Sequence, residues 1–414
     1  ISPAEFCRLP AAESPIPFVD LGAQQEAIRS NLEAKIHTVL HHGQYILGPE
    51  VEQLEHELAG FTQTRHCLSC SSGTDALLMA LMACGIGPGD AVFTSPFTFF
   101  ATAEVIALLG ATPVFVDIDP ATFNLDPGKL ESAIQAVLEN DSSLHPLPVY
   151  NRTPAPDCRQ PAAKNRALTP RAVIPVDLFG LPADYDRINS LAEHHGLRVI
   201  EDAAQSLGAT YHGRQAGSLG HIGCTSFFPA KPLGGYGDGG AVFTDDEALA
   251  RELHSIRVHG MGNDKYDNAR IGINGRLDTL QAAVLLAKLE RFPWEIERRQ
   301  QAAEWYTEHV QAVLKTPAVP RSRTSVWAQY ALLAQNSEHR RALQEGLQAQ
   351  RIPSAIYYPK PLHAQSAFAP LGYQPGDMPV SEDCAARIFS VPLHPYLTEA
   401  EQHKVVQCLQ AGRP

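Results

Sequence analysis

The hydrophobic positions of the chain change their spacing along its length. Apolar residues at helical spacing begin soon after Phe18 and again at Pro49, and they predict two helices that end at Gly43 and Phe61. From residue 66 onward, short β-rich apolar runs alternate with helical stretches. Strands that alternate with helices are typical of a mostly parallel sheet covered by helices on both faces. The pattern therefore predicts an α/β fold.

The predicted elements of this α/β region follow one another at short intervals. Strands are expected at 66–69, 91–95, 112–117, 172–177, 197–202, 224–228 and 240–244. Helices are expected at 74–84, 102–109, 127–138, 184–195, 246–257, 278–289 and 294–314. Beyond Lys315 the pattern becomes an α+β mixture. Strands at 327–333 and 354–358 flank a helix at 339–349, and a last helix begins at the capping box of Thr398.

The change of pattern divides the chain. We expect an extension over residues 1–16, a large domain over 17–290 and a small C-terminal α+β domain over 291–414. The segment 140–170 breaks the rhythm, because it carries six prolines and no periodicity where a short helix-to-strand connection should be. We expect this insert to be a mobile surface loop.

Composition and charge exclude several classes of partner. The chain has 414 residues, with 33 Lys and Arg against 45 Asp and Glu, which gives a net charge of −12. An acidic balance argues against binding to nucleic acid or to an anionic membrane surface. The longest apolar stretches are about a dozen residues, shorter than the roughly 20 of a membrane helix. With no signal-peptide pattern at the start, we expect a cytoplasmic protein.

The cysteines do not predict a metal or disulfide framework. Eight cysteines in a chain of this length are too few for a disulfide scaffold. Cys67 and Cys70 have the spacing of a redox or zinc pair, but no second cysteine or histidine pair completes a zinc site. We therefore expect no metal.

Four motifs carry candidate chemistry, and the first is at 71–77. A predicted strand ends there, two hydroxyl residues and Gly73 follow, and an apolar helix begins. The free N–H groups and the dipole of a helix start bind anions, and Thr74 adds a hydroxyl donor. The alternative is an ordinary N-cap by Ser72 or Thr74.

The second and third motifs are a strand-end carboxylate and an unusual lysine. Asp202 follows a buried strand, where α/β sheets place ligands, although such an aspartate also serves as a helix cap. Lys231 stands between prolines, after an apolar strand and before a glycine loop. A lysine in apolar surroundings loses its charge more readily and becomes a nucleophile that forms Schiff bases. We interpret the glycines of 234–240 as a turn into the next strand.

The fourth motif precedes a predicted helix. Asn274 and Arg276 offer amide and guanidinium donors to an anion, although an N-cap by Asp278 with solvated neighbours explains each residue better when it is taken singly. The order of the motifs is more informative than any one of them. An anion-binding helix start, a strand-end aspartate and a serine five residues before a lysine are what pyridoxal phosphate (PLP) requires for its phosphate, pyridine nitrogen and aldehyde.

The chain resembles the sugar-nucleotide aminotransferases of the DegT/DnrJ/StrS family from about Phe18 to the C-terminus. The resemblance rests on five motifs: GQYILGPEV at 43–51, SGTDAL at 72–77, EDAAQS at 201–206, SFFPAKPLGGYGDGGA at 226–241 and GINGRLDTLQAA at 272–283. It implies fold type I, with a mostly parallel seven-stranded sheet, helices on both faces, a small C-terminal α+β domain and a homodimer with shared active sites.

The resemblance also implies roles around the cofactor, PLP or its amino form PMP. Lys231 matches the Schiff-base lysine, and Asp202 matches the carboxylate at the pyridine nitrogen. Gln205 matches the amide near the ring hydroxyl, and Phe99 the aromatic residue that stacks on the ring. The phosphate would be bound by Gly73, Thr74, Ser226 and the partner subunit's Asn274.

Three further positions match substrate-binding residues of the family. Arg276 matches a position that can hold a substrate carboxylate. Tyr357 and Tyr358 lie where close relatives have a histidine and a tyrosine, so the match is better at Tyr358.

The implied reaction moves the amino group of L-glutamate to a UDP-linked keto-sugar. Within the family the chain is most similar to enzymes that aminate the 3-keto position of UDP-2-acetamido-2-deoxy-glucuronic acid for surface polysaccharides such as O-antigen. Alternatives are a 4-keto-6-deoxy sugar aminotransferase and a non-catalytic PLP-binding regulator. Lys231 argues against the dehydratases of the family, which have histidine there. A nicotinamide enzyme would need a GxGxxG after the first strand, and none follows it.

Overall fold

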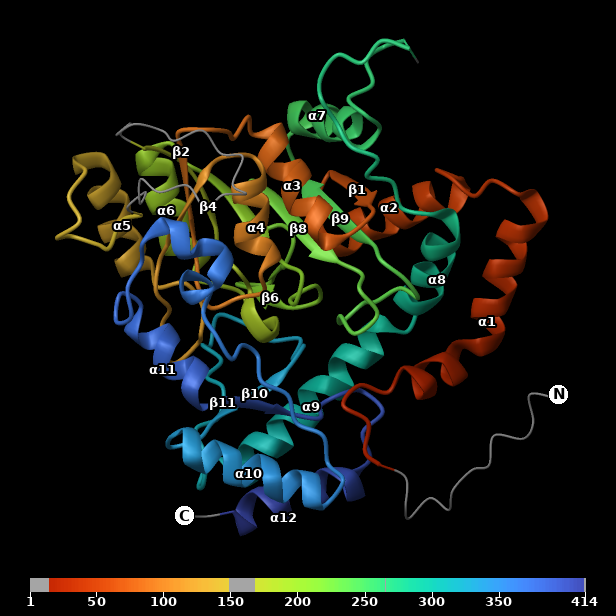
Figure 1. The fold of residues 1–414 in the computed structure, drawn as a ribbon. Coiled ribbons are helices and arrows are strands. Elements are labelled where there is room, and N and C mark those ends of the chain that lie inside the picture. Colours follow the sequence, from red (N-terminus) through yellow and green to blue (C-terminus); the bar gives the residue numbers. More distant parts are fainter. Residues whose placement is uncertain (1–14, 149–167, 265, 413–414) are drawn as a thin grey trace.

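The computed structural model describes residues 15–148, 168–264 and 266–412. A seven-stranded sheet forms its centre (Figure 1), in the order β1-β9-β8-β5-β4-β2-β3. The strands are β1 (His66–Cys70), β2 (Asp90–Thr94), β3 (Thr112–Phe115), β4 (Thr169–Ile174), β5 (Arg198–Asp202), β8 (Ile222–Ser226) and β9 (Gly240–Thr244). Strand β9 is antiparallel to both neighbours and the other pairs are parallel. The predicted mostly parallel sheet is confirmed.

Helices cover both faces of the sheet because its buried strands are apolar on both sides. Val92 packs with one cluster, while its neighbours Ala91 and Phe93 pack with another on the opposite face. The first face is covered by α3 (Gly73–Ala83), α4 (Ala101–Leu108) and α7 (Glu247–Arg257). The second face is covered by α2 (Pro49–Thr62), α5 (Pro127–Glu139), α6 (Tyr185–His195) and α8 (Thr279–Leu289).

The first helix, α1 (Leu21–His42), lies at one side of the molecule against α8. Gly43 ends it with a left-handed conformation (φ 71°) that glycine adopts without strain. Helix α2 begins with Pro49 at its first position. The predicted ends of the first helix and start of the second are confirmed.

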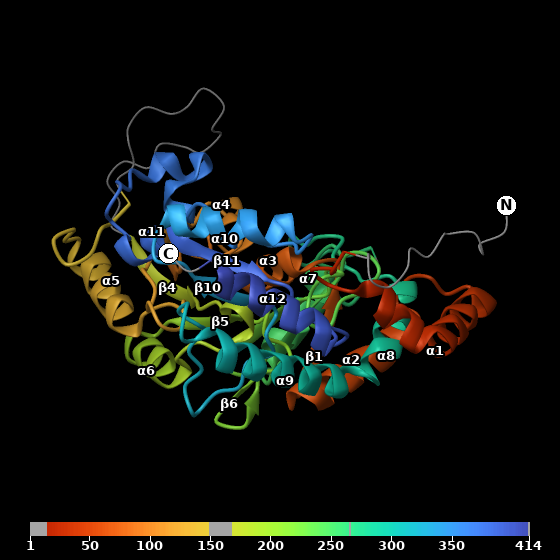
Figure 2. The same cartoon turned by 90° about the horizontal axis from the view of Figure 1, so that it is seen from below.

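The C-terminal part has its own hydrophobic core. Figure 2 shows the helices and strands of this part from below. Helix α9 (Phe292–Val310) leads into it, and β10 (Tyr330–Leu333) pairs with β11 (Ile388–Val391) in an antiparallel ladder. Helices α10 (Ser337–Ala349) and α12 (Glu399–Ala411) complete the core, and α12 begins with the predicted capping box at Thr398. Ile16 is buried in the same core, whereas residues 1–14 of the predicted extension lie outside the described residues.

One predicted strand is wrong. The segment 354–358 forms only a single bridge, between Ala355 and Ser390 of β11. Pro353 and Pro359 flank the segment, and proline removes ladder donors and restricts the residue before it. The partner of β10 is instead β11, which the apolar pattern did not predict.

Short elements complete the described chain. These elements are β6 (Thr210–Tyr211), β7 (Arg214–Gln215), α11 (Pro379–Arg387) and the 3-10 turns η1 (Leu178–Gly180), η2 (Leu362–Ala364) and η3 (Ser366–Leu371).

Asp117 connects the central sheet to α11 of the C-terminal part. It follows β3 and accepts hydrogen bonds from the backbone N–H groups of Val380 and Ser381 at 2.9 Å each. Burial alone would raise the pKa of this carboxyl, but the hydrogen bonds from Ser381 and Val380 outweigh it and lower the pKa.

The proline-rich insert begins in contact with the sheet. His145 is buried, and its ring lies 2.8 Å from the backbone oxygen of Phe115. Burial lowers the pKa of this histidine, so the neutral ring donates that hydrogen bond. Residues 149–167 of the insert lie outside the described residues, and its mobility stays a prediction.

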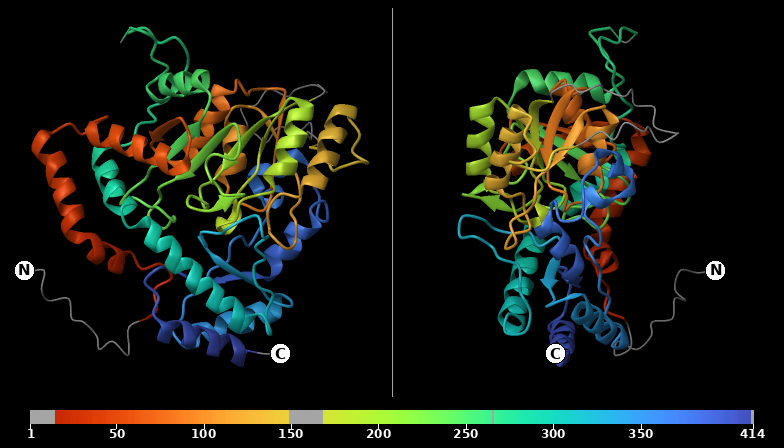
Figure 3. Two further views of the ribbon diagram at one scale, coloured as in Figure 1. Left: turned by 180° about the vertical axis from the view of Figure 1, so that it is seen from behind. Right: turned by 60° about the vertical axis from the view of Figure 1, so that its left-hand side comes forward.

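A hairpin-like segment after α7 projects from the top of the molecule (Figure 3). It is closed at its base by a bridge between Val258 and Asn274. Ile271 in this segment is 86% exposed, so an apolar side chain faces solvent here. No helix among the described residues is long and apolar enough to cross a membrane.

Candidate active site

The predicted site residues gather at one edge of the sheet. Strands β5 and β8 run parallel and end there, at Asp202 and Ser226. Strand β9 starts at the same edge, because Gly240 pairs with both Ser226 and Cys70. Chain segments far apart in sequence therefore meet at the carboxyl ends of the parallel strands, where α/β sheets place ligands.

The start of α3 forms a close-packed cradle at this edge. A side-chain carbon placed on Gly73 would lie 2.6 Å from Cβ of Ser226, and one on Gly240 would lie 2.5 Å from the backbone oxygen of Ser72. Ser72 caps the helix, since its hydroxyl accepts from the N–H of Asp75 at 3.0 Å. The N-cap interpretation and the anion-site interpretation are thus compatible, because a capped helix still presents its other first-turn donors.

Some hydroxyl groups at the start of α3 are already hydrogen-bonded within the protein, and others face the cradle. Asp75 accepts the hydroxyl hydrogens of Ser71 and Ser72 at 2.5 and 3.0 Å. Thr74, in the first turn of α3, and Ser226 at the end of β8 supply the remaining hydroxyls. Glycines that keep the backbone open beside hydroxyls and a helix start fit a phosphate group.

Asp202 is buried, with only 5% of its surface exposed. Its Oδ2 accepts from the Thr102 hydroxyl at 2.8 Å, and its Oδ1 from the N–H of Ala204 at 3.2 Å. Burial raises the pKa of this carboxyl, while Thr102, Ala204 and the charge of Lys231 oppose the rise. A buried carboxylate with few partners is poised to receive a cationic or hydrogen-bond-donating group.

Lys231 lies in a turn directly after β8. Its backbone N–H donates to the oxygen of Phe228 at 2.8 Å, which closes the turn between the two prolines. Burial lowers the pKa of its amine, and the charge of Asp202 partly opposes this. A lowered pKa gives the amine the neutral fraction that nucleophilic attack on an aldehyde needs.

Gln205 and Tyr358 lie in contact with each other. The Gln205 side chain accepts from the N–H of Phe179 at 2.7 Å and donates to the Tyr358 hydroxyl at 3.1 Å. Burial raises the pKa of Tyr358, so its phenol stays protonated. The structure thus places the predicted substrate residue Tyr358 against a predicted cofactor residue.

The other four predicted residues differ in exposure. Phe99 is 58% exposed just before α4. Asn274 is exposed, while Arg276 is half-buried, with a buried Nε that has no hydrogen-bond partner. Between them, the backbone oxygen of Gly275 accepts from the N–H of Ser71, which fixes this segment beside the cradle. Tyr357 packs its ring against Phe18 at 6.3 Å between centroids.

Two buried groups behind this edge were not predicted. Thr102 is one, and its sequence signal is a hydroxyl residue within an apolar helix start. The other is Glu201, whose role was not predicted. Its side chain points away from Asp202, because successive residues of a strand face opposite sides of the sheet. It accepts from the N–H groups of Gly217 and Leu219 at 2.6 and 2.8 Å. Burial and the nearby carboxyl of Asp177 raise the pKa of Glu201 well above its usual value.

Cys67 and Cys70 are both buried in β1. Burial raises the pKa of the Cys67 thiol well above its usual value and that of Cys70 to about 12. Neutral, packed thiols of this kind serve the core rather than redox chemistry.

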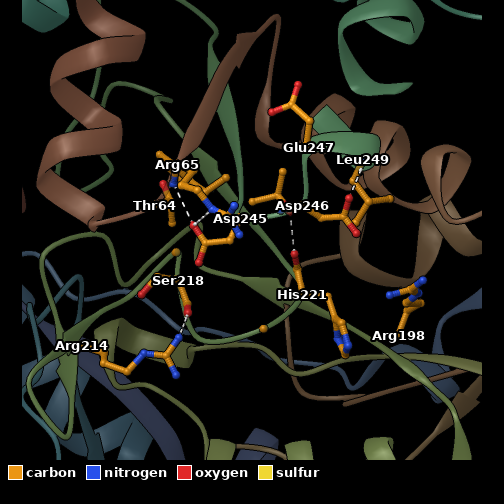
Figure 4. A pocket seen from close by; sticks show the side chains of 14 residues that line it. Thr64, Arg65, Arg198, Arg214, Ser218, His221, Asp245, Asp246, Glu247 and Leu249 are labelled. Atoms are coloured by element: carbon orange, nitrogen blue, oxygen red, sulfur yellow. Dashed lines mark hydrogen bonds and ion pairs between the residues drawn. The ribbon is translucent and has the colours of Figure 1, made fainter. Parts of the chain in front are cut away.

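A cavity of about 460 Å³ lies elsewhere, at the opposite edge of the sheet (Figure 4). Arg198 and His221 line it where β5 and β8 begin. Arg65 and Asp245 form an ion pair at 3.9 Å there, and the backbone N–H of Arg65 donates to the same carboxylate at 2.8 Å. None of the predicted site residues lines this cavity.

Comparisons with known proteins identify the family of the chain. The chain is 46% identical over 388 residues to UDP-2-acetamido-2-deoxy-3-oxo-D-glucuronate aminotransferase of Pseudomonas aeruginosa, covering 93% of this chain and 97% of the relative. A DegT/DnrJ/EryC1/StrS aminotransferase from Brucella abortus has a similar crystal structure, with a TM-score of 0.87, 48% identity and coverage of 96% and 99%.

A third similar structure contains a cofactor. It is NtdA from Bacillus subtilis with bound PMP, with a TM-score of 0.81, 27% identity and coverage of 96% of this chain and 85% of that chain. The sequence model of the DegT/DnrJ/EryC1/StrS aminotransferase family matches residues 26–410. The chain therefore belongs to this family and is a PLP-dependent aminotransferase with the fold of these enzymes.

Proposed function

We propose that the chain transfers the amino group of L-glutamate to a UDP-linked keto-sugar, at the 3-keto position of UDP-2-acetamido-2-deoxy-glucuronic acid. The observation that carries this proposal is the near-complete alignment with the Pseudomonas aeruginosa enzyme, whose name gives that substrate. The half-buried Arg276, with an unpartnered Nε beside the cradle, supplies a cation suited to the uronate carboxylate. The product would serve surface polysaccharide synthesis such as O-antigen, in the cytoplasm.

The residues of the carboxyl edge divide the work of holding the cofactor. When bound, PLP supplies an electrophilic aldehyde and an electron-withdrawing ring. Thr74, Ser226 and the backbone N–H at Gly73 would donate to the phosphate. Asp202 would hold a proton on the ring nitrogen, and its burial would strengthen that contact because the surroundings are poor in water. Phe99 would stack on the ring, and Gln205 would donate to the ring hydroxyl.

Lys231 is the residue that moves protons. Its amine is the group that would hold the cofactor by its aldehyde. As a free amine it would take a proton from the substrate carbon and return it, as general base and general acid. Its lowered pKa suits this role, since a neutral amine is needed at each proton abstraction. Tyr357 and Tyr358 border the space in which the sugar would lie.

We also propose a homodimer with shared active sites, in which the partner subunit's Asn274 completes the phosphate shell. The support is a group of exposed apolar side chains near the site. Tyr45, Ile46 and Leu47 are 48%, 50% and 41% exposed, and Phe228, three residues before Lys231, is 53% exposed. Apolar side chains gathered at a surface are typical of a protein interface.

The division into a large domain at 17–290 and a small domain at 291–414 remains a proposal. It is supported by the separate hydrophobic core that α10, α12, β10 and β11 form with the second half of α9. The contacts of Asp117 with α11 join the two parts, so their relative motion would be limited.

A pair of sugar substrates tests the proposed function. The purified protein is loaded with PLP, and L-glutamate is added while the absorbance of the bound cofactor is followed. Bleaching by glutamate distinguishes an enzyme from a non-catalytic regulator. Amination is then compared between UDP-3-keto-2-acetamido-2-deoxy-glucuronic acid and a 4-keto-6-deoxy sugar nucleotide. Preference for the latter would overturn the substrate and leave the aminotransferase chemistry intact.

A further inference from the structure

Two threonines form a buried hydrogen-bonded chain behind Asp202. Thr98, in the loop after β2, and Thr102, in the first turn of α4, are 3% and 1% exposed. Their hydroxyl oxygens lie 3.2 Å apart, and that of Thr102 lies 2.8 Å from Oδ2 of Asp202. The chain leads from the helix to the carboxylate that the proposed function places at the ring nitrogen.

The direction of these hydrogen bonds follows from the number of hydrogens. An ionised carboxylate only accepts, so Thr102 must donate its single hydroxyl hydrogen to Asp202. Thr98 must then donate to Thr102, because Thr102 has no hydrogen left. Each bond polarises the next, so the chain favours a negative charge on Asp202.

Other groups near Asp202 do not replace this donor. The ionisable side chains that interact electrostatically with it are Lys231, Cys224, Tyr185 and Tyr358. Burial raises the pKa of the thiol and of both phenols, so these three are neutral. Lys231 is the reactive amine of the proposed mechanism and must be neutral at each proton abstraction. It therefore does not supply a permanent positive charge beside Asp202. The remaining donor is the N–H of Ala204, which bonds the other oxygen.

We propose that Thr102, oriented by Thr98, is a positioning residue that keeps Asp202 ionised and so keeps the proton on the ring nitrogen of the cofactor. The inference rests on the proposed contact between Asp202 and that nitrogen. Burial works in the opposite direction, because it favours the neutral carboxyl. Without the Thr102 donor, the proton would move from the ring toward Asp202, and the ring would withdraw electrons less strongly.

The test uses PLP labelled with ¹⁵N in its ring, bound to the full-length protein. The ¹⁵N chemical shift reports directly whether the ring nitrogen carries a proton. In Thr102→Val we expect the proton-sharing equilibrium to shift toward Asp202 by roughly 10- to 100-fold, the value of one hydrogen bond to a charged group. The resonance then moves toward that of unprotonated pyridine, and kcat falls far more than KM changes. Thr102→Ser restores both, and Thr98→Val shows a smaller change of the same sign.

A matched variant separates positioning from loss of stability. Thr94 is also fully buried and donates its hydroxyl to the backbone oxygen of Ile174 at 2.9 Å, away from Asp202. Thr94→Val should lower the melting temperature about as much as Thr102→Val and leave the ¹⁵N resonance unchanged. A wild-type resonance in Thr102→Val would overturn the inference. An unprotonated ring nitrogen in the wild-type protein would instead overturn the proposed role of Asp202.

Discussion

The two edges of the central sheet carry similar side chains in opposite surroundings. At the carboxyl edge, Asp202 is buried and Lys231 is half-buried, and each shifts the pKa of the other. At the opposite edge, Arg198 and Asp245 line an open cavity and are exposed (Figure 4). Solvated charges of this kind are screened and contribute little, whereas desolvated charges interact strongly.

This difference shows that a hollow is not sufficient to define a site. The cavity at the opposite edge has room for a ligand, but its carboxylates are already committed, as Asp246 is to the N–H groups that begin α7. The carboxyl edge instead has glycines that leave space and donors that face it. Ionisable groups with shifted pKa values, together with glycines that leave room for a ligand, thus identify the site better than the volume of a cavity does. Changes at the two edges should therefore have very different effects.

The largest effect is expected for Lys231→Ala. Turnover should fall by about 10⁴-fold, the upper end of what a positioned acid–base group contributes, and the absorbance of the cofactor bonded to lysine should disappear. A second buried lysine offers a control. Lys288 donates to the backbone oxygen of Gly234 at 2.7 Å, and burial lowers its pKa to about 8. Lys288→Met should lower stability and keep the absorbance. Normal turnover in Lys231→Ala would end the proposed mechanism.

Asp202→Asn should separate activity from stability. We expect kcat to fall by about 10²-fold or more, since an amide does not hold the ring proton, while the apoprotein is at least as stable at neutral pH. Burial raises the pKa of Asp202, so the folded apoprotein binds its proton more tightly than the unfolded chain. The wild type therefore loses stability, relative to the variant, as pH rises above the ordinary carboxyl range and through the raised pKa.

Denaturant unfolding of both apoproteins across this pH range measures that difference. The variant's relative gain should grow with pH and then level off. A relative loss of stability at high pH would show that Asp202 stabilises the fold as an ion and would break the contrast between the two edges.

The residues of the carboxyl edge could largely be predicted from the sequence, because each lies in a recognisable local pattern. Asp202 ends a predicted strand, Gly73 begins a predicted helix, and Lys231 stands between two prolines. What brings them together, the pairing of Gly240 with both Cys70 and Ser226, depends on strand order, which no local pattern encodes.

The residues that sequence reasoning missed act through distant contacts. Thr102 reaches a residue 100 positions away, so its hydroxyl looks like an ordinary helix-start residue until the fold is known. The strand predicted at 354–358 failed for a local reason. Its apolar spacing is suitable, but Pro353 and Pro359 flank it, and only Ala355 bridges β11.

A smaller effect is expected for Gly73→Ala, which fills space in the cradle without changing any charge. In Gly73→Ala the new methyl group meets Cβ of Ser226 at 2.6 Å, and overpacking of this kind costs about 1–3 kcal/mol. Cofactor affinity should fall as the cradle closes. Adding Ser226→Gly should restore the stability of the apoprotein but not its cofactor affinity, because a phosphate donor is lost.

Gly60 is the matched control for that glycine. It lies within α2, and a side-chain carbon there would meet nothing within 4 Å. Gly60→Ala should leave cofactor affinity unchanged and stabilise the helix by about 0.5–1 kcal/mol. Equal destabilisation by both alanines would remove the argument that Gly73 is required by close packing.

The smallest effect is expected at the opposite edge, for Arg198→Gln. This arginine is exposed at the start of β5, and Asp202 lies at the other end of the same strand. Four residue steps along a strand span about 13 Å, which exceeds the screening length of roughly 8 Å at physiological salt. Unfolding free energy should change by less than about 0.5 kcal/mol, and kcat should stay at the wild-type value. Glutamate turnover and thermal unfolding at low and physiological salt check both expectations. A fall in kcat that grows at low salt would show that charge at one edge acts on Asp202 at the other, and the two edges would then be parts of one electrostatic site.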